Sequence, residues 1–162
     1  MKLKHWMGTN LATQGYCLSD GERRELWLGL RFSTGLCLAL VVAGLALQSP
    51  TLIFALCAVG AIAGLTPRHP FDYLWNAGAR HLFNAPALPP NPVPRRHAFK
   101  FATTLLVAVG VLLAVGATTP ALVLGVLLVA GCATVTITNL CLPSQALAWW
   151  QRRSTHKEAL TA

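Results

Sequence analysis

The sequence predicts an all-α integral membrane protein: a four-helix bundle made of two helical hairpins arranged as a parallel repeat, with an amphipathic interfacial helix in the central cytoplasmic loop. Hydrophobic residues make up 54% of the 162 residues, and charged residues only 11%. A soluble domain carries about a quarter charged residues, so this composition cannot supply a water-facing surface. The apolar stretches also fall into two pairs, which a long polar segment separates.

The four predicted spans are apolar stretches that end at prolines or polar turns. A helix rises about 1.5 Å per residue, so about 20 residues cross a hydrocarbon core about 30 Å thick. The stretch 51–65 rises only about 22 Å, and we expect the bilayer to thin there or neighbouring helices to screen it. The predicted segments are a cytoplasmic N-terminal segment (1–25), a membrane domain (26–145) with spans at about 26–47, 51–65, 99–115 and 121–142 and an interfacial helix and proline-rich connector at 66–98, and a cytoplasmic tail (146–162).

All 13 Lys and Arg residues lie on one side of the predicted bundle. The hairpin turns, 48–50 and 116–120, carry no charge. The positive-inside rule therefore places both termini and the central loop in the cytoplasm, as a multi-pass protein of the bacterial inner membrane. The net charge of +8 reflects this topology and attraction to anionic lipids on the cytoplasmic side. The expected partners are the lipid bilayer and these lipids, and not nucleic acid.

Two short segments that open the first and third spans share a pattern. Residues 31–36 and 100–105 both read basic, Phe, small, Thr, any residue, Leu, and Pro50 and Pro120 mark the turns that follow. The pattern predicts a duplicated hairpin whose two copies enter the membrane from the same side, which makes it a parallel repeat. Convergence of two hairpins on the same entry pattern is the alternative.

Two local motifs predict how the helices begin and pack. Ser19 and Glu22 have the spacing of a capping box, which starts a helix just before the first span. Gly60 and Gly64 form a GxxxG pair in the second span, which favours close helix packing. The contact lies either within the bundle or with a partner.

The central loop and the tail carry signs of an interfacial location. Residues 70–84 have a helical period, and we expect this helix to lie on the cytoplasmic leaflet with Trp75 as an interface anchor. Five prolines between Pro86 and Pro94 predict an extended connector to the third span. In the tail, aromatic and basic residues that follow one another are the expected anchors: Trp149, Trp150, Arg152 and Arg153.

The sequence contains polar groups but no catalytic motif. The five histidines have no metal-ligand spacing, and we expect no metal and no cofactor. Two groups of side chains are candidates for function. The first is a polar or thiol face on the fourth span, which interface location and helix packing also explain: Thr134, Thr138, Asn139 and Cys141. The second is a cluster for an anion or a lipid headgroup after the second span: Arg68, His69 and Asp72.

The layout resembles a bacterial membrane family known only as a domain of unknown function. The similarity rests on the segment 67–71 (PRHPF), the proline-rich crossing to Arg95 and Arg96, and the segment 139–143 (NLCLP), and it covers about residues 26–145. It implies a four-helix membrane fold and a link to sulfur or thiol proteins. Family members often end the fourth helix with paired cysteines, whereas here Ser144 stands three residues after Cys141.

Three hypotheses for function follow. The uncharged spans and the lack of a catalytic motif favour a non-enzymatic accessory or scaffold subunit of a larger membrane assembly, with a membrane-protein partner. A homo-oligomer is the alternative, and it would favour the second hypothesis. A small permease or channel for a neutral or sulfur-containing solute is the second, and a cytoplasm-facing thiol enzyme that uses Cys141 is the third.

Overall fold

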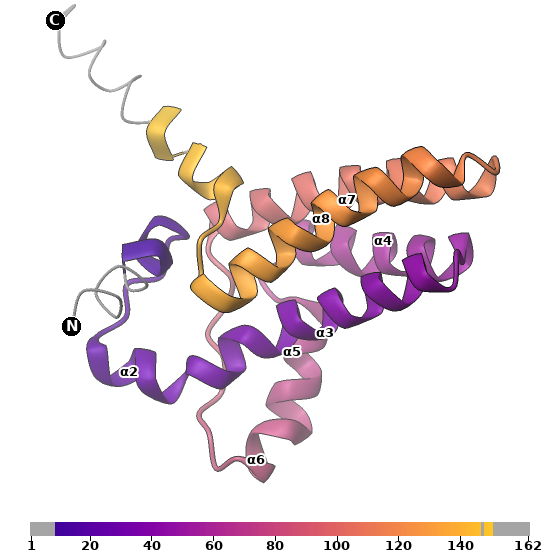
Figure 1. The fold of residues 1–162 in the computed structure, drawn as a ribbon. Helices are drawn as coiled ribbons and strands as arrows, with labels where there is room; N and C mark the ends of the chain where they lie inside the picture. The colour runs from indigo at the N-terminus through magenta and orange to yellow at the C-terminus, as the bar shows by residue number, and fades with distance from the viewer. Residues whose placement is uncertain (1–8, 147, 151–162) are drawn as a thin grey trace, which may run out of the picture.

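The computed structural model describes residues 9–146 and 148–150. Helices make up 79% of it, and this part of the chain contains no strand. The predicted all-α class is confirmed. Four long helices form a bundle (Figure 1): α3 (Trp27–Ala46), α4 (Pro50–Leu65), α7 (Val93–Ala114) and α8 (Thr118–Thr138).

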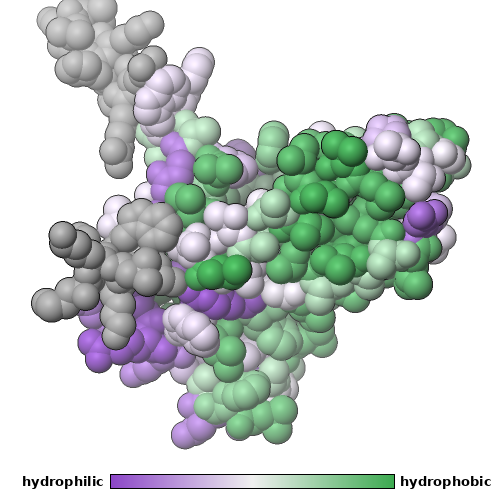
Figure 2. All heavy atoms as spheres, viewed as in Figure 1, coloured by the Kyte–Doolittle hydropathy of each residue, from purple (hydrophilic) through white to green (hydrophobic). Residues whose placement is uncertain are grey.

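The length and composition of these helices suit a membrane. By both criteria α3, α7 and α8 can each cross a bilayer. There is a fourth span if α4 and the helical segment after it are counted together as one. In the most apolar part of α3, α7 and α8, only 17–33% is buried inside the protein. Figure 2 shows that the bundle is largely covered by hydrophobic residues, while hydrophilic residues gather toward one end. The chain therefore fits a small membrane protein.

Both hairpins turn by the same backbone geometry, and Figure 1 shows the two turns at the same end of the bundle. Gln48 and Gly116 adopt the left-handed region, with φ of 47° and 76°. In each turn this residue donates to a carbonyl three positions back, and the next residue donates to one five positions back. These are the bonds of a Schellman motif, which ends a helix with its last carbonyls satisfied. The predicted duplication itself stays a prediction.

Glycines allow the helices of the bundle to approach closely. The main contacts run in a ring, from α3 to α4, α7, α8 and back to α3. A Cβ at Gly64 would lie 2.7 Å from Cγ of Lys100, and one at Gly60 would meet the hydroxyl of Thr103. The GxxxG pair therefore packs α4 against α7 inside the bundle. On the opposite side, Gly125 makes room for the side chain of Leu45.

The helical segment after α4 leaves the bundle sideways. It comprises α5 (Pro70–Leu74), a single π-helical turn η1 (Trp75–Ala79) and α6 (Arg80–Leu82), and together they form what we call the arm. The arm bends away from α4 by 84°, and Figure 1 shows it projecting from the bundle. A short helix α2 (Asp20–Glu25) precedes α3 and carries the predicted capping box between Ser19 and Glu22.

Two helix boundaries differ from the prediction. The third span begins at Val93 instead of about Phe99, because proline fits the first turn of a helix, where its missing N–H leaves no bond unmade. The fourth span begins at Thr118 and ends at Thr138 instead of running from 121 to 142. Asn139 stops it by adopting the left-handed region, with φ of 57°. Cys141 therefore does not continue the polar face of α8.

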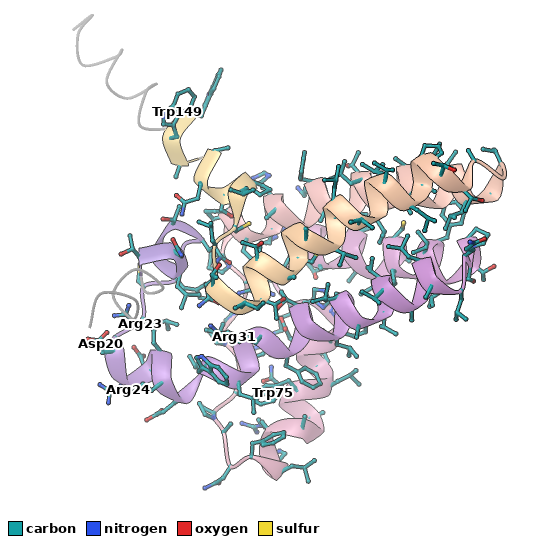
Figure 3. The ribbon with its side chains drawn as sticks, in the orientation of Figure 1. Asp20, Arg23, Arg24, Arg31, Trp75 and Trp149 are labelled. Carbon is teal, nitrogen blue, oxygen red and sulfur yellow. The ribbon has the colours of Figure 1, made fainter. Side chains whose placement is uncertain are left out.

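Trp75 does not lie where an interface anchor would. Its side chain is 1% exposed and packs between the arm, to which it belongs, and α3. Its ring lies 5.3 Å from that of Phe32 on α3, and a Cβ at Gly29 would touch it at 2.9 Å. Figure 3 shows Trp75 beside α3. The role of Trp75 as a lipid anchor stays a prediction, and the burial of its side chain by the protein itself speaks against it.

Candidate functional site: a buried polar cluster at the base of the arm

Asp72 is the centre of a cluster of polar side chains where the arm meets the bundle. Its carboxylate is 5% exposed. Oδ1 accepts a hydrogen bond of 2.5 Å from the hydroxyl of Ser33 on α3. Oδ2 accepts from the backbone N–H of His69 at 3.0 Å and from the side-chain amide of Asn91 at 2.8 Å. One carboxylate thus ties together α3, the start of the arm and the connector to α7.

The local sequence places Asp72 at the start of α5. His69 is the N-cap residue and Pro70 follows it at the first helical position. Asp72 is the third residue of the helix and bonds back to the backbone of His69, as in a capping box. A negative charge is favourable there because the helix N-terminus carries a partial positive charge.

His69 lies between the cluster and the membrane-spanning helices. Its Nδ1 accepts a hydrogen bond from the backbone N–H of Phe71 at 3.1 Å, so in the neutral ring the proton is on Nε2. Nε2 lies 3.5 Å from the sulfur of Cys37 on α3. Burial lowers the pKa of His69 to about 4, although the charge of Asp72 opposes the shift. The imidazole is therefore a neutral donor toward the thiol and is not placed to act as its base.

Arg95 provides the buried positive charge near this carboxylate. It is 6% exposed and donates to the carbonyl of Leu30 at 3.2 Å. Its guanidinium lies over the rings of Tyr16 and Phe99, at 5.3 and 5.7 Å. Buried charges are unfavourable unless polar partners and opposite charges surround them. The cluster therefore combines one acidic and one basic side chain in the same buried region.

Tyr16, which lies in the N-terminal segment, is the last member of the cluster. Its hydroxyl donates to the side-chain carbonyl of Asn91 at 2.8 Å. Burial raises the pKa of Tyr16, and the nearby Arg95 only partly opposes this shift. The phenol therefore stays protonated and serves as a hydrogen-bond donor.

The family of the chain follows from a match over most of its length. The model of a family described as a domain of unknown function (DUF4395) matches residues 28–152. The chain belongs to this family. The resemblance seen in the sequence is thereby confirmed. No curated protein and no solved structure matches the chain.

The DUF4395 match covers most of the cluster. Ser33, His69, Asp72, Asn91 and Arg95 lie inside the matched residues. The N-terminal segment that contains Tyr16 lies before them. The cluster is therefore built mainly within the family domain, and a neighbouring segment adds one further hydrogen bond.

The predicted polar face of α8 is satisfied by its own helix. The hydroxyls of Thr134 and Thr138 donate to carbonyls one turn earlier, at 2.8 and 2.6 Å. Such back-bonding is ordinary for threonine in a helix. Cys141 is 5% exposed. The structure thus brings the two threonines and Asn139 to the end of α8, where the threonines are partly exposed and their hydroxyl protons are used within the helix.

Three side chains from the start of the chain satisfy the end of α8. Arg31 donates to the carbonyl of Ile137 at 3.2 Å. Asn10 donates to the carbonyl of Thr138 at 3.2 Å, and Gln14 donates to that of Asn139 at 2.5 Å. A helix leaves its last carbonyls without intrahelical partners, and here they are capped by the N-terminal segment and α3.

The remaining predicted site residues lie elsewhere. Arg68 is partly exposed, and within residues 9–146 its side chain makes no hydrogen bond to His69 or Asp72. Trp149 and Trp150 are 52% and 67% exposed. Arg152 and Arg153 lie outside the described residues. The described part of the chain also brings together no group of three His, Cys, Asp or Glu side chains that could hold a metal ion.

Sequence reasoning did not find four members of the cluster. Ser33 reads as a small packing residue, and Tyr16 lies in the polar segment before the first span. Asn91 interrupts the proline run, which was the one local signal that the connector does more than span a distance. Arg95 was counted only as a topology charge and as part of the family resemblance.

Burial of His69 predicts a pH-dependent stability. Its pKa is about 4 when folded and about 6.5 when unfolded, so between these values the unfolded chain binds the additional proton. The free energy of unfolding therefore falls as the pH decreases from about 6.5 toward 4, by up to about 1.4 kcal/mol per pH unit from this residue. Unfolding in mixed micelles at pH 7 and pH 5 measures the change. A His69→Gln variant should show a weaker pH dependence, and an equal dependence in both proteins would contradict the assignment.

Proposed function

We propose that the chain is a non-enzymatic scaffold or accessory subunit of a larger assembly in the bacterial inner membrane. The observation that carries the proposal is the buried cluster around Asp72. Its polar groups bind one another and join α3, the arm and the connector. These buried hydrogen bonds therefore fix the arrangement of the helices, as expected for a structural role.

The outer surface of the arm supports this role. Asp72 and Trp75 point inward and are buried, whereas several apolar side chains on the other side are more than half exposed: Tyr73 (57%), Leu74 (55%) and Leu82 (85%). An exposed apolar patch of this kind is typical of contact with a membrane or another protein. The rigid base holds this patch at a defined angle to the bundle.

The two other hypotheses receive less support. A permease that uses the α8 face would need open polar groups, but Thr134 and Thr138 bond to their own helix. A thiol enzyme would need an accessible, activated sulfur. Cys141 is buried, and the imidazole beside Cys37 presents a proton to it instead of accepting one.

We also propose the membrane placement that the basic residues predict. Both hairpin turns are uncharged and lie at one end of the bundle, while α2 and the segment after α8 lie toward the other (Figure 1). Both termini would then face the cytoplasm. Because the arm stands at 84° to α4, an upright α4 lays the arm along the cytoplasmic surface, next to anionic lipids.

Cysteine labelling tests this orientation. Cys17 is exposed and lies before the first span, so a membrane-impermeant maleimide should label it only after the inner membrane is permeabilised. A Gln48→Cys or Gly116→Cys variant, in contrast, should react in intact spheroplasts, because these residues lie in the hairpin turns. The reverse labelling pattern would contradict the proposed orientation.

Purification in a mild detergent tests the scaffold role. The native protein should elute with a second membrane protein in a fixed ratio, identified by mass spectrometry, and variants at exposed arm positions such as Leu82→Glu should weaken that complex. A single chain or homo-oligomer of unchanged size in both proteins would overturn the proposed role and favour the permease.

A further inference from the structure

We propose that Arg96 and Lys100 form a binding site for the phosphate group of an anionic lipid, at the end of the seam between α4 and α7. The inference rests on the proposed membrane placement and names the residues that would hold such a lipid. It moves the predicted headgroup site away from His69 and Asp72, whose polar atoms are already used inside the protein.

The two basic side chains lie together because of helix geometry. Arg96 and Lys100 are four residues apart on α7 and therefore share one face. Arg96 donates through Nη2 to the carbonyl of Leu65, the last residue of α4, at 2.5 Å. Lys100 passes over Gly64, where a Cβ would lie 2.7 Å from Cγ and 3.3 Å from the backbone nitrogen of Lys100. Both side chains thus cross the C-terminal end of α4.

The charges at this seam lack an acidic partner. In the described part of the chain the one ion pair joins Arg23 to Asp20 on α2. In addition, Nε of Arg96 is buried and has no hydrogen-bond acceptor within residues 9–146. The Nε atom itself is enclosed by the protein, so an anionic oxygen at the seam would meet the partly exposed remainder of the Arg96 side chain and the exposed Lys100, and it would balance both charges.

The surroundings favour a lipid over a free anion. Two apolar side chains next to the basic pair face outward: Leu65 (66% exposed), whose carbonyl accepts from Arg96, and Phe101 (55%), which follows Lys100. They belong to the same two helices, one turn or less from the basic residues. A molecule with a phosphate group and acyl chains meets both surfaces at once, whereas inorganic phosphate meets only the charges.

Lipid retention by the full-length protein tests the site. The protein is purified in mild detergent, mixed with phosphatidylglycerol and phosphatidylcholine, and examined by native mass spectrometry. Wild-type protein should retain phosphatidylglycerol preferentially. The double variant Arg96→Gln/Lys100→Gln should lower that retention about thirtyfold, since each of the two basic residues contributes about 1 kcal/mol and about 1.4 kcal/mol is a factor of ten. A control with equal charge loss, Arg24→Gln/Arg80→Gln, should keep it.

Each outcome decides the question. Equal retention by wild type and the double variant, or an equal loss in the control, would overturn the site. Competition by millimolar inorganic phosphate as strong as by phosphatidylglycerol would show a free-anion site in its place. If the double variant does not fold, Lys100→Gln alone carries the test, because Lys100 is exposed. Lipid retention is measured on the chain alone. The lipid site can therefore fail its test while a scaffold partner is still found, and the scaffold role can fail while the lipid is still retained.

Discussion

Replacement of Asp72 by alanine is expected to lower the free energy of unfolding by about 3–5 kcal/mol, the cost of removing one side of a buried charged network. The carboxylate accepts from Ser33, from the backbone of His69 and from Asn91. Alanine leaves these donors buried without an acceptor, and it also leaves the buried guanidinium of Arg95 without the acidic side chain of its cluster. The loss should exceed that of a Ser33→Ala variant, which removes one of the three donors.

Unfolding in mixed detergent micelles, followed by circular dichroism, measures the Asp72→Ala effect. Asp20→Ala is the matched control, because its carboxylate is 80% exposed and pairs with Arg23 on the surface of α2. Exposed ion pairs contribute about 0–1 kcal/mol, so the control should stay close to wild type. Similar unfolding free energies for the two variants would show that Asp72 does not hold the arm to the bundle.

The bundle could be predicted from the sequence because lipid and helix geometry leave few alternatives. Long apolar stretches must form helices in a bilayer, since each backbone polar group needs an internal partner. Pro50 and Gly116 mark the two turns by their fixed or permissive backbone angles. These signals are local, and they were sufficient for the order of the four long helices of the bundle.

The start of α7 and the end of α8 also have local sequence signals, but these signals allow more than one boundary. Proline at the first helical positions is compatible with a helix, so Pro94 lies inside α7 although it belongs to the proline-rich connector. Asn139 is a frequent helix-ending residue because asparagine tolerates the left-handed region. Composition alone extended the fourth span past it, because the apolar Leu140 and Leu142 follow.

The cluster could not be predicted because it depends on the bend after α4. Ser33, Asp72 and Asn91 are far apart in the sequence, and they meet only when the arm returns against α3. Periodicity places Trp75 on an apolar face of the arm, but it does not say whether lipid or protein covers that face. Both environments are apolar, so the same residue pattern serves either.

The Trp75→Ala variant distinguishes these two environments. Trp75 is 1% exposed, stacks on Phe83 at 6.0 Å and donates through its indole N–H to the carbonyl of Pro86 at 3.4 Å. Truncation of a buried tryptophan to alanine costs about 3–5 kcal/mol because a large cavity remains. We expect the arm and connector to lose hydrogen-exchange protection first, while α4 and α7, which pack through their own glycines, keep theirs.

Trp150→Ala is the control for this experiment, because Trp150 is 67% exposed and its removal leaves no comparable cavity. Brominated lipids give a second readout in a variant that keeps Trp75 as its single tryptophan, because the chain has five. They quench the fluorescence of a tryptophan that touches the acyl chains, so Trp75 should be protected from them. If lipid quenching reaches Trp75, or if Trp75→Ala leaves the arm as protected as wild type, the side chain anchors the arm in the membrane and does not fix it to α3. A protected Trp75 and a loosened arm in the variant together mean that the angle of the arm is set by protein contacts, which is what a scaffold surface requires.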